Sequence, residues 1–192
     1  MKDCATEVRD NPSPGTDGST AGSGSGEAEG EPWGVSFEGK TVVVGLGNPY
    51  MRDDGVGIRA ARTLRGLLLG DLVCVYEAQG VDLSLLWQFK GARKVIVIDA
   101  VRSGGHPGTV TRHVIAPKDE PMSRLPSLHA LELYDLFDLA AEGELLPCPV
   151  VIIGVEPDDC SPGEELTSAL TDALPKVVQA AIEELRAGSS VP

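Results

Sequence analysis

The chain has 192 residues, which is enough for one domain with a substantial core, or for one domain plus a tail. Its formal net charge of −13 argues against nucleic-acid backbones and anionic membrane surfaces as partners. No apolar segment approaches the roughly 20 residues that span a bilayer, and the opening MKDCATEVRD lacks the apolar core of a signal peptide, so we expect a cytoplasmic protein.

The first 34 residues differ in composition from the rest of the chain. They are rich in Gly, Ser, Thr, Pro and Glu, with GSTAGSGSGEAEGEP at their centre. Such a segment buries too little apolar surface to offset the entropy that ordering costs. We therefore predict a disordered tail over residues 1–34 and a single α/β domain over residues 35–188.

Strand-like and helix-like patterns alternate through the first half of the domain. Residues 54–68 place apolar side chains at helical intervals, with Asp53 or Asp54 positioned to cap the start of the helix. Residues 81–89 predict a second, short helix. Short apolar runs rich in β-branched residues predict strands at 40–47, 71–78 and 94–101.

The second half continues the alternation. Residues 108–115 alternate polar and apolar side chains, which is typical of an edge strand, whereas residues 149–157 form another continuous apolar run. Helices are predicted at 127–142 and at 166–185, the latter kinked or divided at Pro175. The order β-α-β-α-β-β-α-β-α predicts a three-layer α/β/α sandwich around a mostly parallel five-stranded sheet with one antiparallel strand.

Acidic residues follow two of the predicted strands. Asp54 comes after the first strand, within the turn GLGNPYMRDDGVG, and Asp99 ends the third strand. In open parallel sheets, ligands bind beyond the carboxyl ends of the strands, near the point where the strand order reverses. If the order here is 2-1-3, the two strands are neighbours and both carboxylates face one crevice.

The glycine-rich turn admits more than one interpretation. As a dinucleotide fingerprint it has the first two glycines, but Tyr50 occupies the place of the third, and two acids would oppose a pyrophosphate. The GLGNPY stretch also resembles the opening GLGNPG of peptidyl-tRNA hydrolases. In that family a histidine–asparagine pair follows, whereas this chain continues MRDDGVG, and its charge of −13 fits a tRNA substrate poorly.

A third resemblance covers residues from about 41 to 186. Four stretches, in order and at compatible spacing, resemble the hydrogenase maturation proteases, which trim the C-terminus of the large subunit of nickel–iron hydrogenases. GLGNPYMRDDGVG is similar to that family's G-x-G-N-x-x-x-x-D-[DE]-x-x-G opening, and PSLHALEL to its Ser-x-His helix start. VIVIDAVRSGGHPGTV and VVIIGVEPDDCSPGEELT are similar to its strand ending in Asp and its Gly-x-x-Pro strand end.

The resemblance implies a site formed by Asp54, Asp99 and His129. In the family these positions engage the nickel that the hydrogenase precursor already carries, and two carboxylates with an imidazole suit a divalent first-row metal. The nickel would therefore belong to the substrate rather than to the enzyme. On this interpretation the turn places an acid where a cation arrives, and does not cradle an anion.

These observations lead to one main functional hypothesis. We expect an aspartic-type endopeptidase that recognises nickel and removes the C-terminal extension of a nickel-loaded hydrogenase large-subunit precursor. Its partner is that precursor, with neither nucleic acid nor membrane, and we expect a monomer. The alternatives are a non-catalytic nickel-checking chaperone of the same fold and a peptidyl-tRNA hydrolase-like esterase.

Overall fold

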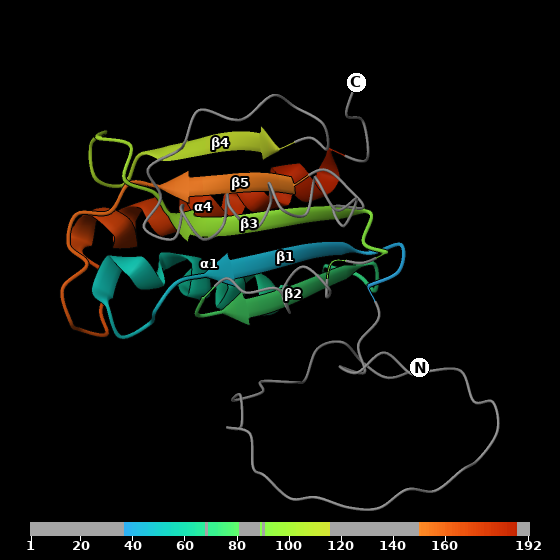
Figure 1. The fold of residues 1–192 in the computed structure, drawn as a ribbon, viewed down its shortest axis with the longest axis horizontal. Coiled ribbons are helices and arrows are strands. Elements are labelled where there is room, and N and C mark those ends of the chain that lie inside the picture. Colours follow the sequence, from blue (N-terminus) through green and yellow to red (C-terminus); the bar gives the residue numbers. More distant parts are fainter. Residues whose placement is uncertain (1–36, 68, 81–88, 90, 116–149, 188–192) are drawn as a thin grey trace, which may run out of the picture.

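A five-stranded sheet forms the centre of the computed structural model, which describes residues 37–67, 69–80, 89, 91–115 and 150–187. The strand order is β2-β1-β3-β5-β4 (Figure 1). β1, β2, β3 and β5 run parallel and β4 runs antiparallel to β5, as predicted. The elements are β1 (Thr41–Leu46), η1 (Arg52–Gly55), α1 (Val56–Arg65), β2 (Val73–Ala78), β3 (Lys94–Ala100), β4 (Val110–Ile115), β5 (Val150–Val155) and α4 (Ser168–Arg186).

The three central strands owe their position to their continuous apolar sequences. Every residue of β1, β3 and β5 is buried, as expected for strands that are covered on both faces. The alternating sequence of β4 lies at one edge of the sheet, where a side chain can reach solvent without a penalty. The predicted edge strand is therefore confirmed, together with the predicted 2-1-3 order of the first three strands.

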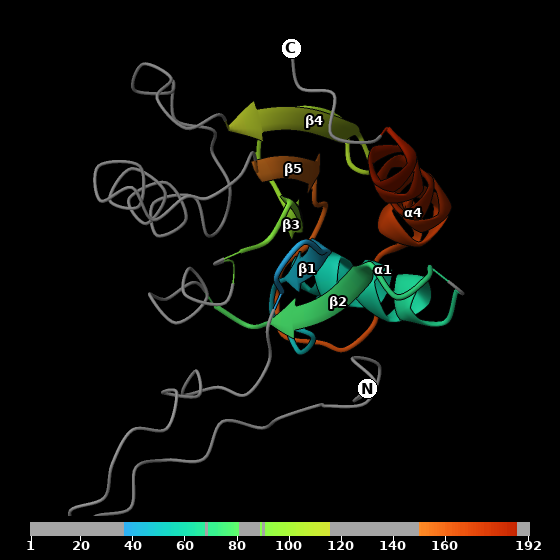
Figure 2. The same cartoon turned by 90° about the vertical axis from the view of Figure 1, so that its right-hand side faces the viewer.

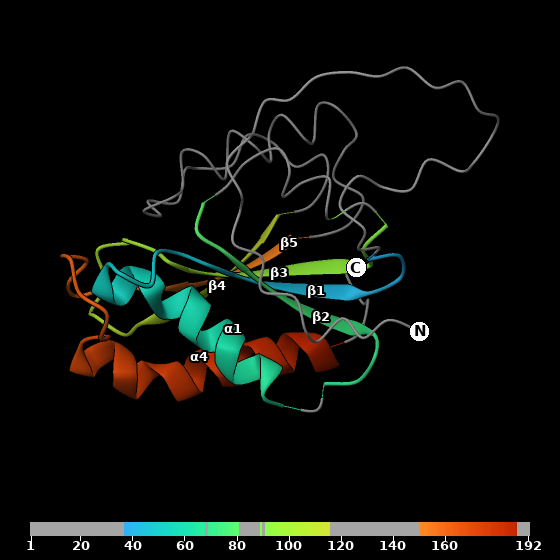
Figure 3. The ribbon, with the colours of Figure 1, turned by 90° about the horizontal axis from the view of Figure 1, so that it is seen from below.

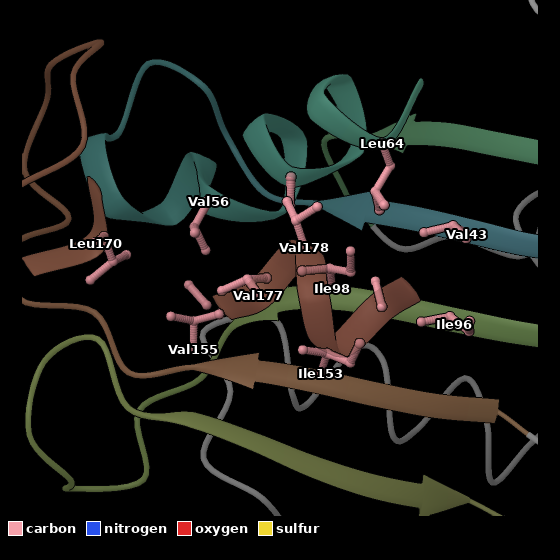
Figure 4. Close-up of a cluster of buried hydrophobic side chains, with 13 residues drawn as sticks. Val43, Val56, Leu64, Ile96, Ile98, Ile153, Val155, Leu170, Val177 and Val178 are labelled. Atoms are coloured by element: carbon pink, nitrogen blue, oxygen red, sulfur yellow. The ribbon is translucent and has the colours of Figure 1, made fainter. Parts of the chain in front are cut away.

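Helices α1 and α4 lie side by side on one face of the sheet (Figures 2 and 3). A single apolar core joins them to the strands, with Val56 and Leu64 of α1 and Val177 of α4 packed over Ile98 and Ile153 (Figure 4). The helices predicted over residues 81–89 and 127–142 fall almost wholly outside the described residues. The predicted tail, residues 1–34, also lies outside them, so the domain boundary stays a prediction.

Helix α4 decides between the two outcomes predicted at Pro175 only in that it is not divided. It runs unbroken from Ser168 to Arg186, with Pro175 inside it, and is not divided there. Pro175 lies on the exposed side of the helix, whereas Ala173 and Val177 on either side of it are buried in the core. Packing on both sides of the proline thus outweighs the one backbone hydrogen bond that the proline removes. None of the described helices is long and apolar enough to cross a membrane.

An ion-pair cluster anchors the C-terminal end of α4, and in it Lys94 and Glu184 are buried while Arg112 is exposed. Glu184 accepts hydrogen bonds from the ammonium of Lys94 on β3, at 2.6 Å, and from the guanidinium of Arg112 on β4. Burial alone would raise the pKa of Glu184, but the hydrogen bonds from Arg112 and Lys94 hold it below its usual range. The cluster fixes α4 against β4 and against the amino-terminal end of β3, which is the end opposite to the candidate site.

Candidate functional site

Three connecting segments meet at the carboxyl edge of the sheet. They follow β1, β3 and β5 and lie together on the left of Figure 1. Backbone hydrogen bonds join them: Arg52 donates to Gly163 at 2.8 Å, and Gly108 donates to Glu156 at 2.8 Å. This edge is where the general rule for parallel sheets places a ligand site.

Asp54 reaches the edge from η1, the short 3-10 helix that follows β1. Its side chain is 7% exposed, and η1 packs against β3. The backbone amide of Asn48 donates to Oδ2 of Asp54 at 2.8 Å. A turn amide that would have to face a pyrophosphate is thus already bound to a carboxylate, which argues against a dinucleotide fingerprint.

Asp99 lies near the carboxyl end of β3, directly beside β1. It pairs with Gly154 of β5, is fully buried, and accepts a hydrogen bond from the amide of Ala100 at 2.8 Å. Because β1 and β3 are neighbouring parallel strands, Asp54 and Asp99 leave the sheet at the same edge. The structure therefore brings the two predicted carboxylates to one region.

The third predicted residue, His129, lies outside the described residues. Within the residues that the structure does describe, no three His, Cys, Asp or Glu side chains gather closely enough to hold a metal ion. The predicted set of Asp54, Asp99 and His129 accordingly stays a prediction.

Asp53 does not cap helix α1, which corrects the sequence-based prediction. The residue at the N-cap of α1 is Gly55, and no side chain makes a capping hydrogen bond there. Asp53 is instead fully buried. Its carboxylate accepts four hydrogen bonds, from the amides of Asp158, Asp159 and Thr167 and from the Thr167 hydroxyl, at 2.7 to 3.0 Å.

Two glycines allow the turn to pack this closely. A Cβ atom on Gly57, in the first turn of α1, would lie 2.2 Å from the carbonyl oxygens of both Leu46 and Ile98. Gly47 has a φ of +133°, and a Cβ there would lie 1.9 Å from the carbonyl oxygen of Asp54. Only glycine fits at either position, because a side chain at Gly57 would push α1 away from β1 and β3, and one at Gly47 would push η1 away from the turn.

Sequence reasoning missed Glu156, the residue that follows β5. It is 7% exposed, and its carboxylate accepts hydrogen bonds from the amide and hydroxyl of Ser103 at 2.7 and 2.6 Å. Burial alone would raise the pKa of Glu156, but the hydrogen bonds from Ser103, Gly105 and Gly104 hold it below its usual value. An acid directly after an apolar strand was the available signal, the same one that identified Asp99.

Arg102, in the segment after β3, and Cys160, in the segment after β5, interact with each other at this edge of the sheet. Burial raises the pKa of the Cys160 thiol, while a hydrogen bond and the positive charge of Arg102 oppose that rise, and the charge of Asp54 adds to it. Hydrogen bonds from Ser161 lower the pKa of Asp159 on the same segment. The edge thus combines carboxylates, a guanidinium and a thiol.

The fold and this edge together define an α/β protein with carboxylates, rather than a phosphate-binding turn, at the end of its first strand. The family model of the hydrogenase maturation proteases (HycI) matches residues 59–184, well over half of the chain. The chain therefore belongs to the hydrogenase maturation protease family and is an endopeptidase of hydrogenase maturation.

Individual relatives agree with this assignment. The chain is 26% identical over 156 residues to the hydrogenase expression/formation protein HoxM of Cupriavidus necator, covering 79% of this chain and 76% of HoxM. It is 29% identical to the hydrogenase 2 maturation peptidase of Thaumarchaeota archaeon SCGC_AB-539-E09, with a TM-score of 0.61 over 77% of this chain and 98% of that one. The E. coli hydrogenase-maturating endopeptidase HybD shares the fold, at 22% identity and a TM-score of 0.67 over 78% and 94% of the two chains.

Proposed function

We propose that this chain removes the C-terminal extension of a hydrogenase large-subunit precursor that already carries nickel. Its membership of the maturation protease family supports the reaction class. One structural observation carries the assignment of the site: Asp54 and Asp99 leave the neighbouring parallel strands β1 and β3 at the same edge. The precursor is the partner, and the nickel enters the site as part of the substrate.

Two carboxylates at one edge of the sheet offer oxygen ligands to a divalent nickel ion. Asp99 is fully buried and accepts a hydrogen bond from the amide of Ala100. Asp54 is held at the same edge and keeps a small exposed fraction. Together with the imidazole of His129, these oxygen ligands would complete the coordination of a nickel ion that the precursor holds only in part.

Cleavage then requires an activated water molecule at the peptide bond that follows. The substrate's nickel can polarise the scissile carbonyl, or a carboxylate of the site can take the proton of the attacking water. In either case the leaving amine must gain a proton. Because recognition would require nickel, cleavage would occur only after metal insertion is complete.

The test is to incubate the purified chain with nickel-loaded and with nickel-free precursor and to weigh the products by mass spectrometry. We expect a mass loss equal to the C-terminal extension with the nickel-loaded precursor only. Binding without any mass loss would instead identify a nickel-checking chaperone, and cleavage without nickel would refute nickel recognition. Size-exclusion chromatography with light scattering checks the expected monomer, and cell fractionation checks the expected cytoplasmic location.

A further inference from the structure

Asp53 stands out among the buried side chains because it is directly adjacent to a proposed site residue but faces away from solvent entirely. It is 0% exposed, whereas its neighbour Asp54 is 7% exposed. All four of its carboxylate hydrogen bonds come from the segment between Asp158 and Thr167, which follows β5. A buried carboxylate with this number of donors joins two distant parts of the chain.

The turn that carries Asp54 has little rigidity of its own. Helix η1 contains only four residues, and single turns of 3-10 helix are weakly stabilised. Arg52, which begins η1, has a φ of +46°, a left-handed conformation that is strained for a non-glycine residue. Contacts from elsewhere must therefore hold this turn in place.

Those contacts come from the segment 158–167. The amide of Arg52 donates to the carbonyl of Gly163 at 2.8 Å, and the amide of Gly163 donates to the carbonyl of Tyr50 at 2.9 Å. The amide of Asp53 donates to the carbonyl of Asp159 at 3.1 Å. The carboxylate of Asp53 lies among these bonds and supplies the charged acceptor, and hydrogen bonds to charged groups are the stronger ones.

We infer that Asp53 is a positioning residue for the proposed cleavage: it locks the segment 158–167 onto η1 and thereby holds Asp54 in its working orientation. This inference rests on the proposed function. Displacement of a reacting group by about 1 Å costs an enzyme up to about a hundredfold in rate. Loss of the lock should consequently reduce the rate of the chemical step more than the binding of the precursor.

The decisive variant is Asp53→Asn, which keeps the size of the side chain. Its carboxamide has one acceptor oxygen and one donor group. If the oxygen takes the place of Oδ2, the amide of Thr167 loses its partner; if it takes the place of Oδ1, the amides of Asp158 and Asp159 and the Thr167 hydroxyl lose theirs. We expect kcat for nickel-loaded precursor to fall at least about tenfold with KM changed less than about threefold. Hydrogen exchange at the amides of residues 158, 159 and 167 should accelerate. The matched control is Asp172→Asn, an exposed Asp→Asn change in α4, and it should behave as the unaltered protein.

A second, milder variant keeps the inference testable if Asp53→Asn does not fold. Thr167→Val removes one hydroxyl donor to Asp53 and leaves the carboxylate and the three amides in place. It should fold and show a smaller fall in kcat, of about twofold to fivefold. All rates are measured at least about 15 °C below the melting temperature of each variant, so that the folded fraction is nearly complete.

The outcomes separate a positioning role from a merely structural one. If Asp53→Asn lowers the melting temperature but the folded protein cleaves with unchanged kcat, the inference is overturned. If Asp53→Asn does not fold and Thr167→Val cleaves with unchanged kcat, it is overturned as well. If the unaltered protein does not cleave the nickel-loaded precursor, both the proposed function and this inference are refuted.

Discussion

Neighbouring aspartates at positions 53 and 54 have opposite surroundings, although they share one short turn. Asp53 is fully buried among hydrogen-bond donors of the segment after β5, whereas Asp54 accepts one amide hydrogen bond and keeps some exposure. Asp99, on the adjoining strand, is also fully buried. The chemistry of this edge therefore depends on which carboxylate a substrate can reach, and single substitutions can separate their roles.

The first prediction concerns the three proposed site residues, changed one at a time to Asp54→Asn, Asp99→Asn and His129→Ala. Asparagine keeps most of the hydrogen-bonding ability of aspartate but removes the charge that a cation needs. Each variant should remain folded and lose most or all cleavage, with the stability of Asp54→Asn within about 1 kcal/mol of the parent. Thermal unfolding and precursor cleavage are measured on the same samples. Unstable variants whose folded fraction cleaves normally would show that these residues are structural.

The second prediction concerns Gly57. In Gly57→Ala the new methyl group would meet two backbone carbonyl oxygens at 2.2 Å, so α1 must move away from β1 and β3. We expect a loss of about 3 kcal/mol or more in the free energy of unfolding, measured by urea denaturation. Gly80→Ala is the matched control, because a Cβ at Gly80 meets nothing within 4 Å and should leave stability nearly unchanged. Equal stability of the two variants would contradict the close approach.

At the scale of elements, the strands could be predicted better than the contacts between their connections. The strands β1, β3 and β5 followed from continuous apolar runs, and strand-end geometry placed Asp54 and Asp99 at one edge. The role of Asp53 could not be predicted, because its partners lie 105 to 114 residues further along the chain. The local sequence pattern around Asp53 predicted only a cap for the helix that follows it. The unbroken course of α4 through Pro175 likewise depends on tertiary packing.

The third prediction concerns the anchoring of α4 by Glu184. Glu184→Gln removes the charge that Lys94 and Arg112 share, and should lower the free energy of unfolding by about 1–3 kcal/mol at pH 7. Glu183→Gln is the matched control: the neighbouring side chain is exposed, so the change should stay within about 0.5 kcal/mol.

The pH dependence of that loss follows from the direction of the pKa shift. The pKa of Glu184 is lower in the folded protein than in the unfolded chain, so its stabilising contribution is present above the unfolded value, about 4.3, and disappears as the pH falls through the folded value. The difference in stability between Glu184→Gln and the parent should therefore shrink below about pH 4. A difference that grows on acidification would contradict the ion-pair cluster.

At the scale of the whole molecule, the composition separates the first 34 residues from the domain. Deletion of residues 1–34 should leave the melting temperature and precursor cleavage nearly unchanged, because this segment has few apolar side chains to dock on the domain. Differential scanning calorimetry and the cleavage assay check both properties. A loss of several degrees, or of cleavage, would show that the segment contributes to the domain.

We expect cleavage at the site of Asp54 and Asp99 to require the nickel that the precursor carries. The most direct measurement is to prepare precursor with graded nickel occupancy, determine the occupancy by elemental analysis, and weigh the products after cleavage is complete. We expect the fraction of precursor that loses its C-terminal extension to equal the fraction that carries nickel, at every occupancy. Complete cleavage at low occupancy, or none at full occupancy, would contradict it.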